Sequence, residues 1–336
     1  MNTFFQIILC LAIATWAPIC ATEGYQTNSF TLQHLDQVLQ KLIEETPLSD
    51  RAQDRIRGYL FHAQKQALEK ENGSMDQFSL HVIQLFYPKY QPAAAPMLMP
   101  ELDQRYKDEQ GHIHPTLLKM PGGGWEGTLP YHGIEISSWK PWVLQSADQF
   151  RVAAPPTEKS FWTDQLAKVK VAMQNATLSQ RQRISYWAGK PDIASGDWIV
   201  ILNQYMLANH TPLLKQIQVR DAVAKATVDA TIAAFDSKYA YLVKRPVMLD
   251  PDLKTVISTP NHPTFPSAHS TVSAAVVEVL LYYFPENRCE WLRLLEEAGL
   301  SRIWAGIHFP IDHEAGKSLG KKVGHAILKA LGEPLR

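Results

Sequence analysis

The sequence predicts an all-α protein, built as a bundle of helices. Through most of the 336 residues, apolar side chains recur at intervals of three and four, which is the period of an amphipathic helix. Segments with this pattern follow one another over short links, and no convincing run alternates apolar and polar residues as a strand would. Helix packed on helix is the fold class that this order predicts.

The chain opens with an apolar run. Residues 1–21 are typical of a cleaved secretory signal with its break after Ala21, because the run ends there and polar residues follow. The run carries no Lys or Arg, so an uncleaved anchor and a lipid-modified Cys20 stay open as alternatives. We therefore expect a periplasmic or secreted protein. Loss of the leader would leave Cys289 alone, so no internal disulfide is expected.

Helical periodicity then divides the rest of the chain. Residues 22–100 are predicted as an N-terminal helical extension, and residues 101–156 as a loop-rich connector in which prolines and a triple glycine break the pattern. From residue 157 to 336 the pattern returns, with Thr177 as a predicted cap and Pro310 at a first helical position. Helices are expected over residues 32–43, 51–68, 75–86, 158–173, 179–187, 197–208, 211–244, 267–284, 287–298 and 310–331.

Composition excludes several classes of function. The 33 basic and 33 acidic residues cancel, which argues against nucleic acid as a partner. The longest later apolar run, residues 272–284, is too short for a bilayer and contains Glu278, so no transmembrane segment is expected in the mature chain. His112, His114, His132 and His313 lack metal-ligand spacing, and His313 is expected to flank a site without chemistry.

Three short stretches in the last third of the chain concentrate cations and histidines. In the first, Lys238 and Arg245 are seven residues apart, which on a helix places them on nearly one face, two turns apart. Pro246 follows directly and is expected to stop that helix. Both cations can then point at one anion.

The second stretch is Pro266-Ser267-Ala268-His269. It follows a proline-rich turn and opens the apolar segment 271–283, which puts the backbone N–H groups of Ser267, Ala268 and His269 at a helix N-terminus. Such a helix end favours anions.

The third stretch contains Arg302, His308 and Asp312. The four-residue spacing lets the Asp312 carboxylate accept the Nδ1–H of His308 and leaves Nε2 facing the anion. Each cation alone is typical of a solvated surface charge. Together with the helix end, the three cations predict a cradle for a tetrahedral oxyanion, in which an arginine can bind two oxygens at once.

In order and spacing, the three stretches resemble the signature motifs of the type 2 phosphatidic acid phosphatase and vanadium haloperoxidase superfamily. The chain departs from that pattern at Ala268, where the family usually has glycine; alanine keeps the N–H but needs slightly more room. Residues 145–198 also resemble the helical lead-in of the haloperoxidase-type branch. The resemblance implies an all-α bundle with its site between the helices that carry the motifs, and a catalytic domain over residues 157–336.

The resemblance implies a phosphatase of phosphate monoesters that requires no metal or other cofactor. His308 would attack phosphorus to give a phosphohistidine, Asp312 would hold its tautomer, and His269 would protonate the leaving alkoxide and then activate water. The expected partner is a small-molecule phosphoester, and nothing indicates the oligomeric state. The groups expected to bind the phosphate oxygens are Lys238, Arg245, Ser267, Arg302 and the N–H of Ala268.

Two other functions fit the same residues. Vanadate has the shape of phosphate, so a vanadium haloperoxidase is the first alternative, with His308 as the single metal ligand and His262 beside the halide. Lys244 argues against it, because that branch commonly has tryptophan there. The second alternative is a non-catalytic binder of phosphate or phospholipid headgroups.

Overall fold

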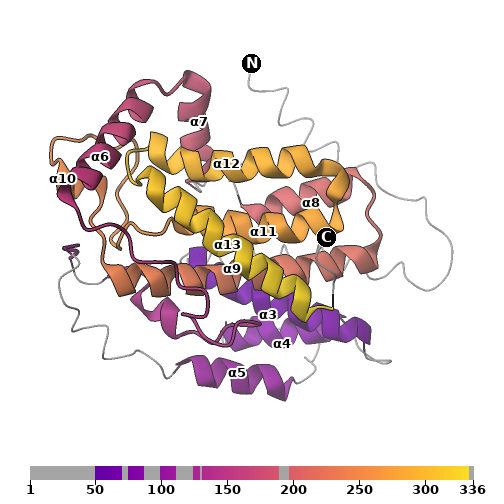
Figure 1. The fold of residues 1–336 in the computed structure, drawn as a ribbon. Coiled ribbons are helices and arrows are strands. Elements are labelled where there is room, and N and C mark those ends of the chain that lie inside the picture. Colours follow the sequence, from indigo (N-terminus) through magenta and orange to yellow (C-terminus); the bar gives the residue numbers. More distant parts are fainter. Residues whose placement is uncertain are drawn as a thin grey trace.

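The protein is an all-α bundle, as predicted (Figure 1). The computed structural model describes residues 50–69, 75–86, 99–110, 124–128, 131–188 and 197–332, and these ranges contain no strand. The predicted leader and the predicted helix over 32–43 lie outside the described residues. Among the residues that are described, no helix combines the length and the apolar character needed to span a bilayer.

Most helices begin and end within a few residues of the prediction. Thr177 caps its helix through a capping box with Gln180, and Asp197 caps the next helix through Ile199 N. The helical elements are α3 Asp50–Glu69, α4 Met75–Phe86, α5 Pro100–Gln110, η2 Ile134–Ser138, α6 Lys159–Gln174, α7 Leu178–Trp187, α8 Trp198–Ala208, α9 Leu213–Tyr241, α10 Pro246–Leu249, α11 Ala268–Tyr283, η3 Pro285–Asn287, α12 Arg288–Trp304 and α13 Pro310–Ala330.

Three boundaries differ from the prediction. Helix α9 stops at Tyr241 because Leu242 takes a left-handed conformation with φ 49°, so the helix does not reach residue 244. Helix α12 continues to Trp304, six residues beyond the predicted end at 298, and therefore includes Arg302. The connector predicted from residue 101 starts with helix α5, whose charged sequence lacks an apolar stripe and which packs Tyr106 on the ring of Phe86.

Helices α9, α11 and α13 form the centre of the bundle, with α3 and α4 below α9 and α12 beside α11 in the view of Figure 1. Helices α11 and α13 approach backbone to backbone along a stripe of glycines spaced four residues apart. A Cβ added at Gly316 would lie 2.7 Å from the backbone oxygen of the cap residue Ser267, and one added at Gly324 would lie 2.7 Å from that of Ala275. One added at Gly320 would overlap the backbone oxygen of Thr271. This close approach brings the N-termini of α11 and α13 together.

The connector is fastened to α9 by a buried carboxylate. Asp229 accepts the backbone N–H groups of Trp142, Val143 and Leu144 at 2.6 to 3.0 Å. These three bonds satisfy the backbone donors of two half-buried residues and of the buried Leu144. Trp125 N adds a bond to the oxygen of Leu242 (2.9 Å), so the connector also covers the turn that follows α9.

Candidate active site

Lys238 and Arg245 reach one buried region, but not along one helix. Lys238 lies in the last turn of α9, whereas Arg245 lies beyond the end of α9 and caps the short helix α10. The expectation that both cations share a helix face is therefore wrong, because the left-handed Leu242 turns the chain between them. Both side chains are nevertheless fully buried.

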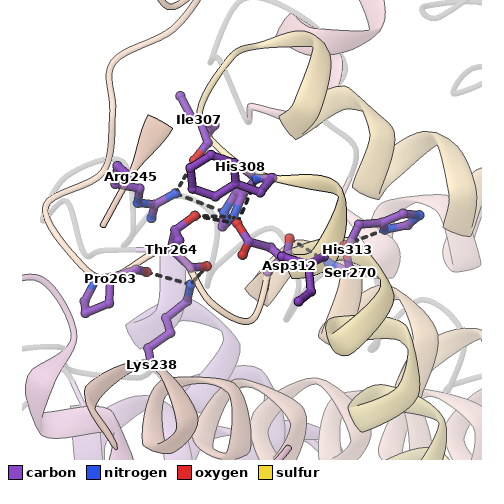
Figure 2. Close-up of polar contacts among 12 residues, drawn as sticks. Lys238, Arg245, Pro263, Thr264, Ser270, Ile307, His308, Asp312 and His313 are labelled. Atoms are coloured by element: carbon purple, nitrogen blue, oxygen red, sulfur yellow. Dashed lines mark hydrogen bonds and ion pairs between the residues drawn. The ribbon is translucent and has the colours of Figure 1, made fainter. Parts of the chain in front are cut away.

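Backbone carbonyls fix the two cations. Lys238 Nζ donates to the oxygens of Pro263 (2.8 Å) and Thr264 (2.7 Å). Arg245 NH1 donates to the oxygen of Ile307 (2.7 Å) and lies 3.1 Å from Nε2 of His308 (Figure 2). The backbone acceptors are uncharged, so these hydrogen bonds position the two cations without neutralising them, and both charges also act on the carboxylate of Asp312.

His308 and Asp312 form the predicted pair. Nδ1 of His308 lies 2.8 Å from Oδ2 of Asp312, and both side chains are buried (Figure 2). The same oxygen accepts the hydroxyl of Thr264 at 2.5 Å and the N–H of Phe309 at 2.9 Å. A carboxylate with this many donors fixes the ring so that Nδ1 carries the proton and Nε2 carries the lone pair.

Burial and neighbouring cations set the charges of this pair. Loss of solvent, followed by the charges of Arg245 and Lys238, lowers the pKa of His308 well below its ordinary value. Burial raises the pKa of Asp312 to about 6, against the hydrogen bonds from Thr264 and Phe309, which favour the ionised form. At neutral pH, His308 is therefore an uncharged imidazole held by an ionised carboxylate.

The start of α11 supplies a helix end, with one correction. Ser267 caps the helix, and its hydroxyl accepts the N–H of Ser270 at 3.3 Å. The backbone N–H of Ser267 donates to the oxygen of Asp312 (2.9 Å), so it is used to join α11 to α13 and does not contribute to the anion site. Ala268 and His269 are the first helical residues, whose N–H groups have no acceptor within a helix.

His269 is exposed, and its Nε2 lies 3.0 Å from the backbone oxygen of Trp187 at the end of α7. Its charge contributes to the shift at His308, so the two histidines act on each other electrostatically. The side chain stands at the solvent side of a site whose other groups are buried. That position suits a group that exchanges protons with water and a leaving group.

Arg302 is the third buried cation. Its Nε donates to the hydroxyl of Ser301 (3.0 Å) and its NH2 to the oxygen of Ile184 on α7 (2.9 Å). Burial lowers the pKa of Arg302 to about 10, which still leaves the guanidinium charged at neutral pH. A cation desolvated to this degree gains from an anionic partner.

His262 contacts the site through Arg245. The backbone oxygen of His262 accepts Nε of Arg245 (2.9 Å), and its Nδ1 lies 3.0 Å from Arg245 NH2. The ring also packs 5.1 Å from that of Phe235. Lys244 is half-buried. Its side chain packs against the backbone of Gly124, so closely that a Cβ added to this glycine would lie 2.9 Å from Lys244 Cε.

Two side-chain contacts around the site, made by Thr264 and His313, cannot be predicted from the sequence. Thr264 has no motif around it, and only the fold brings its hydroxyl to Asp312. His313 is buried, with Nδ1 2.8 Å from Ser270 Oγ and Nε2 3.0 Å from Oε2 of Glu296, so it braces α13 against α11 and α12. The sequence predicts that His313 flanks the site without chemistry; its partners on α11 and α12 are the part that the sequence does not indicate.

Part of the sequence matches a known family and a curated relative. Residues 222–333, which include every motif residue, match the sequence model of the PAP2 superfamily. A stretch of 70 residues is 31% identical to the bacitracin transport permease protein BcrC of Bacillus licheniformis, covering 21% of this chain and 34% of the permease. The match thus spans about a third of the length of that curated relative.

Solved structures of bacterial vanadium-dependent peroxidases are among those with a similar fold. A bacterial vanadium-dependent iodoperoxidase superposes with a TM-score of 0.68 at 19% identity, over 93% of this chain and 97% of the other. A holo-type bacterial vanadium-dependent chloroperoxidase gives 0.56 at 14% identity, over 90% and 79%. At these identities the likeness establishes the architecture of the bundle.

Proposed function

From the premise that this chain belongs to the PAP2 superfamily, we propose that it is a metal-independent phosphatase of phosphate monoesters that works through His308. One observation carries the proposal: Nε2 of a buried, uncharged His308 lies 3.1 Å from the buried guanidinium of Arg245 and within the field of the buried Lys238, with Asp312 behind the ring. Lys238, Arg245 and Arg302 would bind the phosphate oxygens, and the N–H of Ala268 would add a donor.

In the first step, the Nε2 lone pair of His308 forms a bond to phosphorus. The bond between phosphorus and the ester oxygen breaks, its electron pair stays on that oxygen, and His269 supplies the proton that the leaving alcohol needs. The imidazole of His308 becomes positively charged when Nε2 is phosphorylated. Asp312 stabilises that charge through Nδ1–H, which is why its carboxylate must be ionised.

In the second step, water replaces histidine on phosphorus. His269 takes a proton from the water as the new bond from oxygen to phosphorus forms, and the electron pair of the broken nitrogen–phosphorus bond returns to Nε2 of His308. Inorganic phosphate leaves. Arg245 and Lys238 are held by carbonyls throughout, so the charges that stabilise the transferring group need little rearrangement.

The donor set also fits vanadate. The same cations and the N–H of Ala268 would hold its oxygens with His308 Nε2 as the ligand, and bound vanadate would there supply oxidation of halide by peroxide. This alternative uses the residues of the phosphatase site and no others. An activity assay, and not the geometry of the site, therefore distinguishes a haloperoxidase from a phosphatase.

One purified batch tests the proposal. We expect hydrolysis of 4-nitrophenyl phosphate in the presence of a metal chelator, inhibition of that hydrolysis by vanadate, and no halide-dependent bromination of a phenolic dye by peroxide after loading with vanadate. Bromination without phosphate release would support the haloperoxidase instead. Tight binding of phosphate with neither activity would support a binding protein and end the enzymatic proposal.

On the acid side, the pH profile of kcat/KM should begin to fall near pH 6. Because the pKa of Asp312 is raised to about 6, its carboxylate is present above that pH and is lost as the pH falls through it. We expect kcat/KM to fall below about pH 6, since a protonated Asp312 cannot stabilise the charged imidazole. The Asp312→Asn variant, slower throughout, should lack this limb. Ionisation of the substrate affects both proteins equally, so it cancels when kcat/KM of the wild type is divided by kcat/KM of Asp312→Asn. If this ratio of kcat/KM values stayed constant from pH 7 to pH 5, the prediction would be contradicted.

A further inference from the structure

We infer that the last turn of α7 is a positioning element for His269, and that the carboxylate of Glu297 holds this turn in place. The inference rests on the proposed function, because it assigns His269 the role of acid and base. Two carbonyls of that turn contact the site: the oxygen of Trp187 lies 3.0 Å from Nε2 of His269, and the oxygen of Ile184 accepts NH2 of Arg302 at 2.9 Å. The last four carbonyls of a helix have no donor within the helix, so they are available to such side chains.

The contact with Trp187 decides which nitrogen of His269 does chemistry. A carbonyl oxygen can only accept, so Nε2 of His269 carries a hydrogen in the neutral ring as well as in the charged one. The proton that the ring gives to the leaving alcohol, and later takes from water, therefore sits on Nδ1. After the first step the ring remains as the tautomer protonated on Nε2, which the Trp187 oxygen stabilises.

Glu297 on α12 fastens the turn. Its Oε1 accepts the indole N–H of Trp187 at 2.9 Å and Nε of Arg183 at 2.5 Å, while its Oε2 accepts NH1 of Arg293 at 2.7 Å. Burial raises the pKa of Glu297, but the bonds from Trp187 and Arg183 outweigh it and hold the pKa below its ordinary value. The acceptor is thus a carboxylate at neutral pH, and its bond to a buried indole is charge-assisted.

A second brace reaches the same turn from α11. The rings of Trp187 and Trp198 lie 5.6 Å apart, and the indole N–H of Trp198 donates to Ser273 Oγ at 2.9 Å. Because Ser273 is one turn beyond His269 on α11, the turn that accepts from His269 is tied to the helix that carries it. The last turn of α7 is therefore held from α12 and from α11.

The dependence of kcat/KM on the leaving group tests the inference. This dependence responds to how well His269 protonates the leaving alcohol, whereas a general loss of packing would slow all substrates alike. Butyl phosphate needs a protonated leaving group far more than 4-nitrophenyl phosphate does. For Glu297→Ala we expect kcat/KM for butyl phosphate to fall about tenfold further than kcat/KM for 4-nitrophenyl phosphate. Glu297→Gln keeps an acceptor for the indole N–H. Its ratio of kcat/KM for butyl phosphate to kcat/KM for 4-nitrophenyl phosphate should therefore stay within about threefold of the wild-type ratio.

Two further variants make the comparison sharp. Trp187→Phe keeps an aromatic ring and the backbone oxygen but removes the indole N–H, so it should repeat the effect of Glu297→Ala. It also provides the test if Glu297→Ala does not fold. Glu290→Ala is the matched control: Glu290 lies on the same helix and binds the same Arg293 at 2.7 Å, so removing it should leave the ratio unchanged. Equal losses on both substrates for Trp187→Phe and Glu297→Ala would overturn the inference.

The tautomer is measurable without turnover. In protein labelled with ¹⁵N-histidine, with the resonance assigned by His269→Gln, we expect neutral His269 to be protonated on Nε2 and bare on Nδ1; the reverse tautomer would overturn the inference. If the wild type shows no phosphatase activity that depends on His308, the proposed function fails, while this spectrum still tests whether Nε2 of His269 carries the hydrogen that a bond to the Trp187 oxygen requires. An active wild type with the wrong tautomer would refute the positioning role alone.

Discussion

Replacing His308 by alanine is expected to lower phosphatase kcat by at least about a thousandfold, because the variant has no atom to form the bond to phosphorus. The three buried cations remain, so binding of phosphate should survive. The expected pattern is therefore a loss of kcat with inorganic phosphate still binding, measured by steady-state kinetics and by calorimetry on the same samples.

A chemical signature accompanies the rate. Rapid acid-free quenching of the wild type with a phosphate ester labelled in the phosphoryl group should trap label on the protein, in a linkage that is stable to base and labile to acid. His308→Ala should trap none. As a control, His313→Gln changes a buried histidine next to Asp312 that touches Ser270 and Glu296, and it should still trap label. Full activity of His308→Ala in pure protein would refute the mechanism.

Replacing Gly320 by alanine is expected to destabilise the fold. In an open helix this change would stabilise by roughly 0.5–1 kcal/mol, since glycine is a poor helix former. Here the new methyl group would overlap the backbone oxygen of Thr271, and a backbone cannot move aside as a flexible side chain can. Overpacking of this kind costs about 1–3 kcal/mol, so the net effect should be a loss of stability.

The same change should also reduce activity. Helices α11 and α13 would have to separate. This separation would stretch the hydrogen bond from Ser267 N to the backbone oxygen of Asp312, which joins the two halves of the site. Urea unfolding gives the stability, and kcat/KM gives the effect on the site. Ser318→Ala, at an exposed position of α13, is the control and should change neither. An unfolding midpoint for Gly320→Ala at or above that of the wild type would contradict the close contact of the helices.

Much of the fold could be predicted because its determinants are local. Apolar spacing predicted the helices, and Thr177 with Gln180 is a cap that can be read from neighbouring residues. The pair of His308 and Asp312 belongs to the same class, since four residues across a helix start place the two side chains in contact. Helix α5 was missed because its charged sequence has no apolar stripe, and its packing against α4 is not visible in the sequence.

The arrangement of the site depended on contacts between distant segments. Lys238 and Arg245 were predicted to share a helix face, whereas Leu242 turns the chain and the fold brings both cations back to one place. Thr264 and the carbonyl of Trp187 belong to no motif. They reach Asp312 and His269 only because loops and helices far apart in the sequence are packed together.

The sequence by itself therefore determined the class of fold, the limits of most helices and the inventory of three cations, two histidines and one carboxylate, because each depends on residues within a few positions of one another. The tertiary structure decided how these groups are used: which backbone N–H joins helices instead of facing the anion, which acceptors hold the cations, and which nitrogen of His269 is tied to α7. Those properties follow from the distances between α7, α9, α11, α12 and α13, and such distances are set by the glycine stripe and the packed core as a whole.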